Sequence, residues 1–217
     1  MGVTKLGRPL VFNNFKEIFD KYYDKVDNGH RGDHVKRVLK NAQRIAKTIK
    51  DCDHDVVLVN CLFHDICRAT EIDDHAVEGA VLARELLKDH HILTPDQIDN
   101  ICDSIETHRF SRGKVARTIE GKILQDADRL DSIGPIGIVR TLQYSIKKGK
   151  PIYDQNIPPA EVYNKNTPRT TAINHIIEKQ MSIRIDTFNF PKSQIMAKEH
   201  ISLTKKFVEL YVDAMNV

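Results

Sequence analysis

Apolar residues recur with the period of an α-helix along almost the whole of this 217-residue chain. Between Asp33 and Ile49 they fall three or four positions apart and form one stripe, and Asp33 is the predicted N-cap of this helix. Strand-like alternation of apolar and polar residues is essentially absent. With only 10 Gly and 8 Pro, turn-dense all-β folds are also disfavoured. The sequence therefore predicts an all-α fold.

Further helices are predicted from the same period and from capping residues. The segment that starts at Val56 is apolar nearly all round, as expected for a helix in the centre of a bundle. Thr94 and Pro95 are typical of an N-cap followed by the first helical residue. The predicted helices cover residues of about 33–49, 56–68, 73–87, 94–105, 118–134, 135–145, 170–185 and 193–215.

One long segment breaks the helical pattern. Residues 147–168 contain four prolines and no apolar period, so we predict a long loop there. No Ser-, Gly- or Pro-rich linker divides the chain and no internal repeat is present, which favours a single domain over residues 1–217. Its core is expected over about 28–145, and a C-terminal helical extension over about 169–217.

Charge and composition exclude several classes of protein. The 33 basic and 30 acidic residues leave a net charge of +3, far from the excess typical of nucleic-acid binding, although a small anionic ligand fits. No apolar run is long enough for a membrane span or a signal peptide. The 4 cysteines lack metal-site spacing and are expected to be reduced. We expect a soluble cytoplasmic protein without a membrane or nucleic-acid partner.

Histidine and aspartate residues interrupt the apolar face of these predicted helices. His64 and Asp65 stand inside an apolar run, where an unpartnered carboxylate would be costly to bury. His34 and Asp128 lie in comparable places on two other helices. A bound cation would remove the cost, and two histidines with two carboxylates suit a divalent ion such as Mn²⁺, Fe²⁺, Ni²⁺ or Mg²⁺. A structural zinc site would more often use thiolates.

These residues form motifs that resemble a known family, the HD-domain metal-dependent phosphohydrolases. The resemblance spans residues of about 28–145, and segment 171–179 is similar to a subgroup of bacterial nucleoside-triphosphate pyrophosphohydrolases. The matching motifs are His34-Val-Lys-Arg37-Val, His64-Asp65-Ile and Asp126-Ala-Asp128-Arg129-Leu-Asp131.

The resemblance implies a metal site and a set of catalytic residues. By it, His34, His64, Asp65 and Asp128 are the metal ligands, and Asp128 is preferred to its neighbour Asp126 on the family pattern alone. Asp65 would also orient the attacking water.

Further roles follow from the same resemblance. Arg129 would stabilise charge on the substrate phosphate, and His75 would protonate the departing oxygen, so both are expected to be catalytic. Arg68, His108 and Arg140 are expected to contact substrate. In two-metal relatives His75 and His108 bind a second ion, but this chain has Arg109 where those enzymes have another histidine.

The implied function is that of a divalent-metal-dependent phosphohydrolase acting on a nucleotide, with manganese among the candidate ions. Metal-activated water would attack a phosphoanhydride or phosphoester, for example to convert a nucleoside triphosphate to monophosphate and pyrophosphate. Loop 147–168 would gate the site. Two alternatives stay open: a dinuclear cyclic-nucleotide or dinucleotide phosphodiesterase, and a non-catalytic nucleotide-sensing module. A homodimer is compatible with the sequence.

Overall fold

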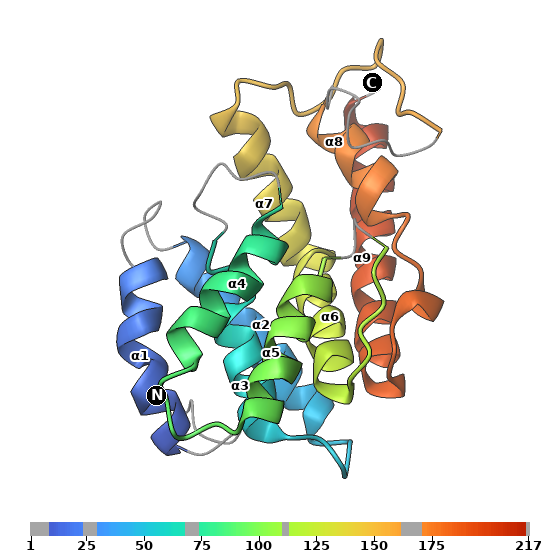
Figure 1. Cartoon of the computed structure of the whole chain (residues 1–217). Coiled ribbons are helices and arrows are strands. Elements are labelled where there is room, and N and C mark those ends of the chain that lie inside the picture. Colours follow the sequence, from blue (N-terminus) through green and yellow to red (C-terminus); the bar gives the residue numbers. More distant parts are fainter. Residues whose placement is uncertain (1–8, 24–29, 68–73, 110–112, 162–170, 216–217) are drawn as a thin grey trace. The chain divides into compact units, whose positions relative to one another are not determined.

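The computed structural model describes residues 9–23, 30–67, 74–109, 113–161 and 171–215. All regular elements of these residues are helices, which confirms the predicted all-α fold (Figure 1). The chain divides into two compact units, Met1–Arg129 and Leu130–Val217. None of the described helices is long and apolar enough to cross a membrane.

The described residues of the first unit form six helices, and the last of these helices ends two residues beyond the unit. Helix α3 contacts α1, α2 and α5, and α4 packs against α5. All residues of α3 from Asp55 to Phe63 are buried, as its apolar composition predicts. The helices are α1 (Pro9–Tyr23), α2 (His30–Ala46), α3 (His54–Phe63), α4 (His75–Leu87), α5 (Pro95–Thr107) and α6 (Ile119–Asp131).

Helix starts in this unit follow ordinary capping chemistry, with one correction. Thr94 caps α5 through a capping box with Gln97, as predicted. The predicted cap at Asp33 is wrong, because α2 already begins at His30 and places Asp33 in its first turn. A carboxylate there still interacts favourably with the positive end of the helix dipole.

Helix α3 ends earlier than its apolar pattern predicts. The pattern continues to residue 68, yet the helix stops at Phe63 and residues 64–67 form a turn. The amide of Ile66 donates to the carbonyl of Phe63, three residues back, so the backbone tightens at this point. His64 and Asp65 therefore lie in a buried turn rather than on a regular helix face.

A polar network joins the starts of α3, α5 and α6. The Glu120 carboxylate accepts hydrogen bonds from the Asp53 amide (2.8 Å) and from Asn100 Nδ2 (2.9 Å). Gln97 Nε2 donates to Asp53 Oδ2 at 2.7 Å. Because the network is partly buried and satisfied by several partners, it fixes the starts of these three helices relative to one another.

The second unit packs around a smaller apolar core. Residues Ile138, Ile173, Ile176 and Val208 form this core, and α7 packs against α9. The elements are α7 (Gly134–Lys147), α8 (Ala172–His175), the π-helical turn η2 (Ile176–Gln180), the 3₁₀ turn η3 (Ile185–Thr187) and α9 (Pro191–Met215).

The helix predicted over residues 170–185 is shorter and less regular than its sequence indicates. Thr171 caps it by accepting from the amide of Asn174. After one α-helical turn the Met181 amide donates to the carbonyl of Ile176, five residues back, and the segment ends there. Such π-helical turns are rare, and local sequence patterns do not predict them.

The described part of the predicted loop, residues 148–161, has no regular secondary structure, as expected. Hydrogen bonds fasten it to residues 172–178 of its own unit. These include Ala172 N to Pro151 O (3.1 Å), Ile173 N to Ile152 O (3.0 Å), Asn174 Nδ2 to Ile157 O (2.9 Å) and Ala160 N to Glu178 Oε1 (2.8 Å). Residues 162–168 lie outside the described residues.

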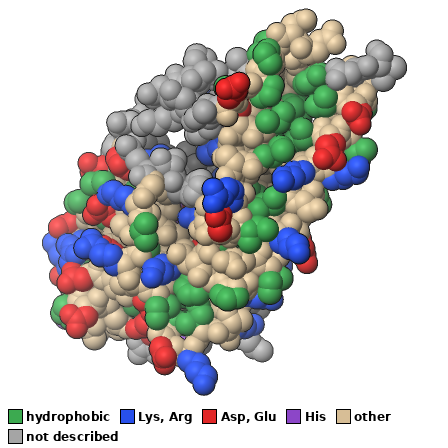
Figure 2. Space-filling model, turned by 90° about the vertical axis from the view of Figure 1, so that its right-hand side faces the viewer, with side chains coloured by type: hydrophobic (Ala, Val, Ile, Leu, Met, Phe, Trp, Pro, Cys, Tyr) green, Lys and Arg blue, Asp and Glu red, His purple; other side chains and the backbone are tan. Residues whose placement is uncertain are grey.

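Apolar side chains are exposed on α9. Ile195, Leu203 and Leu210 are spaced by eight and seven residues, so they share one helix face. Hydrophobic side chains lie between charged ones on the side of the molecule drawn in Figure 2. The homodimer that the sequence allows stays a prediction.

Gly137 provides a test of packing in the second unit. A Cβ at this position would lie 2.3 Å from the carbonyl oxygen of Ser132, which is backbone and cannot rotate away. We expect Gly137→Ala to lower the free energy of unfolding by about 1–3 kcal/mol or more, measured by urea denaturation. Gly79→Ala in α4 is the control, because its Cβ would meet Ile105 at an ordinary 3.5 Å and should stabilise by about 0.5–1 kcal/mol. Equal stability of the two variants would contradict this account.

Candidate metal centre

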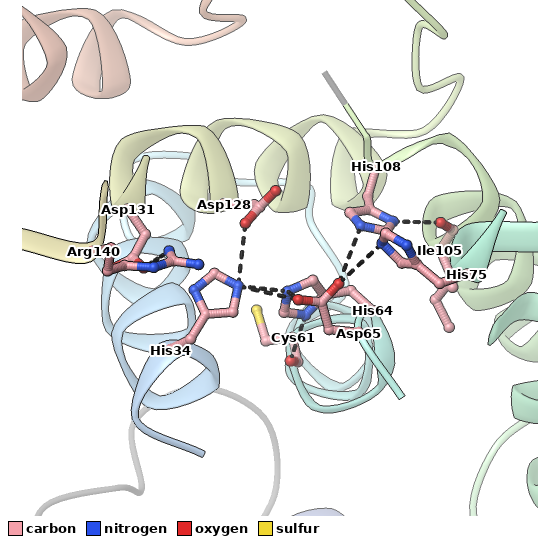
Figure 3. Close-up of polar contacts among 10 residues, drawn as sticks. All are labelled: His34, Cys61, His64, Asp65, His75, Ile105, His108, Asp128, Asp131 and Arg140. Atoms are coloured by element: carbon pink, nitrogen blue, oxygen red, sulfur yellow. Dashed lines mark hydrogen bonds and ion pairs between the residues drawn. The ribbon is translucent and has the colours of Figure 1, made fainter. Parts of the chain in front are cut away.

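Four potential metal ligands come together in the first unit from three parts of the chain (Figure 3). His34 lies in the second turn of α2, His64 and Asp65 lie in the turn after α3, and Asp128 lies in the last turn of α6. Asn41 Nδ2 of α2 donates to the carbonyl of Ala127 at 3.3 Å, which holds α2 against α6 beside Asp128.

Three of these residues, His34, His64 and Asp65, form one group of donor atoms, and Asp128 adjoins this group through His34. His34 Nε2 lies 3.2 Å from His64 Nε2, 3.3 Å from Asp128 Oδ1 and 3.5 Å from Asp65 Oδ2. His64 Nε2 lies 3.8 Å from Asp65 Oδ2. Ligand atoms that each bind one ion at about 2.1 Å are separated by about 3.0–3.4 Å in octahedral or tetrahedral geometry. The observed separations are close to this range, so the residues fit a divalent ion.

A hydrogen bond of His64 to the backbone determines which of its ring nitrogens faces His34 and Asp65. His64 Nδ1 lies 3.0 Å from the carbonyl oxygen of Cys61. A carbonyl oxygen only accepts, so Nδ1 carries the hydrogen and Nε2 presents a lone pair to the group. Metal-binding histidines are commonly oriented by a carbonyl in this way.

Asp65 belongs to a second cluster through its other oxygen. Asp65 Oδ1 lies 3.4 Å from His75 Nε2 and 3.7 Å from His108 Nε2. His108 Nδ1 donates to the carbonyl of Ile105 at 2.6 Å, so its Nε2 also presents a lone pair. The three side chains could hold a metal ion as a group, as could His34, His64 and Asp65. Asp65 thus stands between two sets of histidines.

Burial sets the charge state of the first group. Complete burial lowers the pKa of His64 to about 4, against a smaller opposite effect of Asp65. Burial raises the pKa of Asp128, but the bond to His34 and the nearby histidines outweigh it and hold this pKa well below its usual range. At neutral pH a neutral imidazole and a carboxylate are present, which are the protonation states that metal ions bind.

Access to the site is uneven. The side chains of Asp128 and His75 are 21% and 12% exposed, whereas His34, His64, Asp65 and His108 are exposed by 7% or less. A ligand from solvent therefore meets Asp128 and His75 before the other groups.

The arginines predicted to contact substrate are placed differently from one another. Arg129 is buried in the first unit, with Nη1 4.0 Å from Asp126 Oδ1. Burial lowers the pKa of its guanidinium, and Asp126 and Asp128 oppose this. Arg140 belongs to the second unit, where its Nη1 lies 2.6 Å from Asp131 Oδ2. Arg68 lies outside the described residues.

Two residues beside the site were not identified as functional from the sequence. Gln125 is buried on α6, and its Nε2 donates to the carbonyls of Thr107 (2.7 Å) and Lys114 (2.8 Å). Asp74, next to His75, pairs with Arg109, next to His108. Gln125 carries the same signal as Asp128, a polar residue in an apolar helical pattern, and could have been found by it.

Comparison with known proteins supports the resemblance at the level of the domain. Residues 31–133 match the HD domain family. The uncharacterized protein YpgQ of Bacillus subtilis is 28% identical over 188 residues, covering 83% of this chain and 82% of YpgQ. The yeast cyanamide hydratase DDI2 (Saccharomyces cerevisiae) is 34% identical over 90 residues, which is 39% of this chain and 40% of DDI2.

Solved structures show the same fold along nearly the whole chain. An HD-superfamily hydrolase from Bacillus thuringiensis has a TM-score of 0.75 and 25% identity, and the match covers 95% of this chain and 97% of that one. Bacillus subtilis YpgQ, solved in complex with ADP, has a TM-score of 0.67 and 21% identity, with coverage of 94% and 96%. The chain has the HD-superfamily hydrolase fold.

Proposed function

We propose that this protein, whose residues 31–133 match the HD domain family, is a divalent-metal-dependent phosphohydrolase that acts on a nucleotide. The observation that carries the proposal is the convergence of buried His34, His64 and Asp65, with Asp128 Oδ1 3.3 Å from His34 Nε2. Burying the two imidazoles and the Asp65 carboxylate costs their hydration, and a bound cation would offset that cost. Manganese is among the ions that this ligand set accepts.

The proposed mechanism assigns a role to each polar side chain. A divalent ion held by the four ligands would lower the pKa of water and polarise a phosphoryl oxygen. Asp65 would orient the attacking water, because its two oxygens face both histidine groups. His75, partly exposed and 3.4 Å from Asp65, would donate a proton to the departing oxygen. Arg129 would add positive charge near the phosphate.

A nucleotide is the proposed substrate for two reasons. A relative of the same fold, YpgQ, has been solved with ADP bound. Segment 171–179 also resembles the pyrophosphohydrolase subgroup, and in this structure it fastens the loop through Asn174 and Glu178. We propose release of pyrophosphate from a nucleoside triphosphate, with His108, Arg68 and Arg140 contacting the substrate and loop 147–168 gating the site.

A second candidate is a dinuclear phosphodiesterase. The observation in its favour is the group formed by Asp65, His75 and His108, in which Asp65 presents one oxygen to each set of histidines. A carboxylate in that position can bridge two ions. The number of ions bound per chain separates this candidate from the mononuclear one.

A product-resolved assay tests the proposal. Chelator-stripped protein is offered Mn²⁺, Fe²⁺, Ni²⁺ or Mg²⁺ with nucleoside mono-, di- and triphosphates, cyclic dinucleotides and cyanamide, and phosphate is resolved from pyrophosphate. We expect metal-dependent release of pyrophosphate that His64→Ala reduces by roughly 10²–10³-fold. Turnover of cyanamide alone, or of phosphates without any metal, would contradict the proposal.

A further inference from the structure

We propose that Arg109 and Gln125 are positioning residues that hold His108 and His75 against Asp65. The inference rests on the proposed function, since it concerns the second histidine group of that site. It starts from the two chain neighbours of His108, each of which is tied to a different helix.

Arg109 connects the two histidines through their neighbours. Arg109 Nη1 lies 3.3 Å from Asp74 Oδ1, and these residues directly follow His108 and directly precede His75. Asp74 stands at the N-cap position of α4, yet its side chain makes no capping hydrogen bond there. An N-cap aspartate normally accepts from the first turn, at a gain of about 1 kcal/mol. Asp74 is directed to the end of α5 instead.

Gln125 holds the other side of His108. Its amide nitrogen donates to the carbonyl of Thr107, the residue before His108, and to the carbonyl of Lys114. Gln125 lies three residues before Asp128 on α6, so one helical turn separates these two hydrogen bonds from the predicted metal ligand Asp128. The two hydrogen bonds of Gln125 therefore hold the end of α5 against α6, the helix that carries Asp128.

Together these ties leave His108 little freedom. Its ring is already anchored by the Nδ1 bond to Ile105, and the backbone on both sides is fixed by Gln125 and Arg109. The rings of His75 and His108 are held with centroids 5.8 Å apart, and both point a nitrogen at the same Asp65 oxygen. Loss of the Gln125 or the Arg109 interaction would let the rings of His75 and His108 move, while His34 and His64 keep their positions.

A role in binding phosphate is the competing explanation for Arg109, and Asp74 separates the two. If Arg109 bound substrate, Asp74→Asn would release the guanidinium and leave substrate affinity unchanged or improved. If Arg109 positions the histidines, Asp74→Asn acts like Arg109→Ala. Both side chains are partly exposed, at 24% and 30%, so each position has room for the other side chain.

The test compares five variants of the full chain in saturating Mg²⁺: Arg109→Ala, Asp74→Asn, Gln125→Ala, the exchange Asp74→Arg with Arg109→Asp, and Gln97→Ala as control. Gln97 is also a bridging glutamine of this unit, but at the opposite end of α5. We expect the first three to lower kcat by roughly 10-fold with KM changed less than twofold. The exchange should recover kcat to within about threefold of the original, and Gln97→Ala should leave it unchanged.

Side-chain NMR signals of the histidine rings give a second readout that does not need turnover. The signals of His75 and His108 should shift in Arg109→Ala and Gln125→Ala, while those of His34 keep their positions. Unshifted rings, a KM effect confined to Arg109→Ala, or an equal loss of kcat in Gln97→Ala would each overturn the inference. If the unmodified protein turns over no phosphate compound, the proposed function fails. The NMR signals of the histidine rings then decide by themselves whether Arg109 and Gln125 position His75 and His108.

Discussion

Asp65→Asn is expected to abolish metal-dependent turnover, with a loss of roughly 10²–10³-fold or more in kcat. Asp65 is the residue shared by both histidine groups, since Oδ2 faces His34 and His64 and Oδ1 faces His75 and His108. Asparagine keeps the size of the side chain but removes its charge and replaces one acceptor oxygen by a donor. Titration calorimetry with Mn²⁺ should show weaker binding in parallel with the lost turnover.

The control for this variant removes a carboxylate of the same unit away from the site. Asp103 of α5 pairs with Arg117 at 2.6 Å, so Asp103→Asn also breaks an ion pair. It should retain turnover and Mn²⁺ affinity within about twofold, because a partly exposed pair contributes little. Full activity of Asp65→Asn, with both proteins folded by circular dichroism, would refute the metal-site assignment.

The positions of the helices could largely be predicted because they follow from local chemistry. The apolar period locates α2 to α6, and the Thr94–Gln97 box marks the start of α5. What the period cannot show is where a buried segment stops being helical. Apolar Ile66 and Cys67 continue the pattern beyond His64 and Asp65, so the hydrophobic pattern does not mark the tightening of the backbone after Phe63.

The choice between Asp126 and Asp128 shows a similar limit. Two carboxylates two positions apart have the same chemistry, and only the family resemblance favours Asp128. In the structure Asp128 Oδ1 lies 3.3 Å from His34, whereas Asp126 is buried with its oxygen facing Arg129. Positions two apart point to different sides of a helix, so the decision depends on where α2 packs.

Contacts between distant segments are the part that no local pattern contains. Asp74 and Arg109 are 35 residues apart, and Gln125 and Thr107 are 18 apart. The sequence around each residue does not indicate its partner, even for Gln125, whose place in an apolar helical pattern is a signal by itself. The Asp74–Arg109 pair follows from the packing of α4 against α5, and the Gln125–Thr107 hydrogen bond joins α6 to the end of α5.

The metal-free protein should lose stability as the pH falls, because of His64. Its pKa is lowered from 6.5 to about 4 by burial, so the folded state disfavours the proton that the unfolded chain accepts below pH 6.5. The unfolded state then binds more protons, and the free energy of unfolding falls between pH 6.5 and 4. Lowering the pKa of His64 from 6.5 to about 4 corresponds to a loss of about 3 kcal/mol in the free energy of unfolding at low pH.

The comparison of the protein with His64→Gln isolates this contribution. Groups that do not interact with His64 titrate alike in both proteins, so the difference between the two stability curves reports His64 and the groups coupled to it, such as Asp128. Urea denaturation at half-unit steps should give a difference that narrows by about 3 kcal/mol from pH 7 to pH 4. Added Mn²⁺ should stabilise the protein near pH 7 and lose its effect as the imidazole gains a proton, since the ion and the proton compete for Nε2. Parallel curves for the two proteins would show that His64 is not held neutral in the folded state.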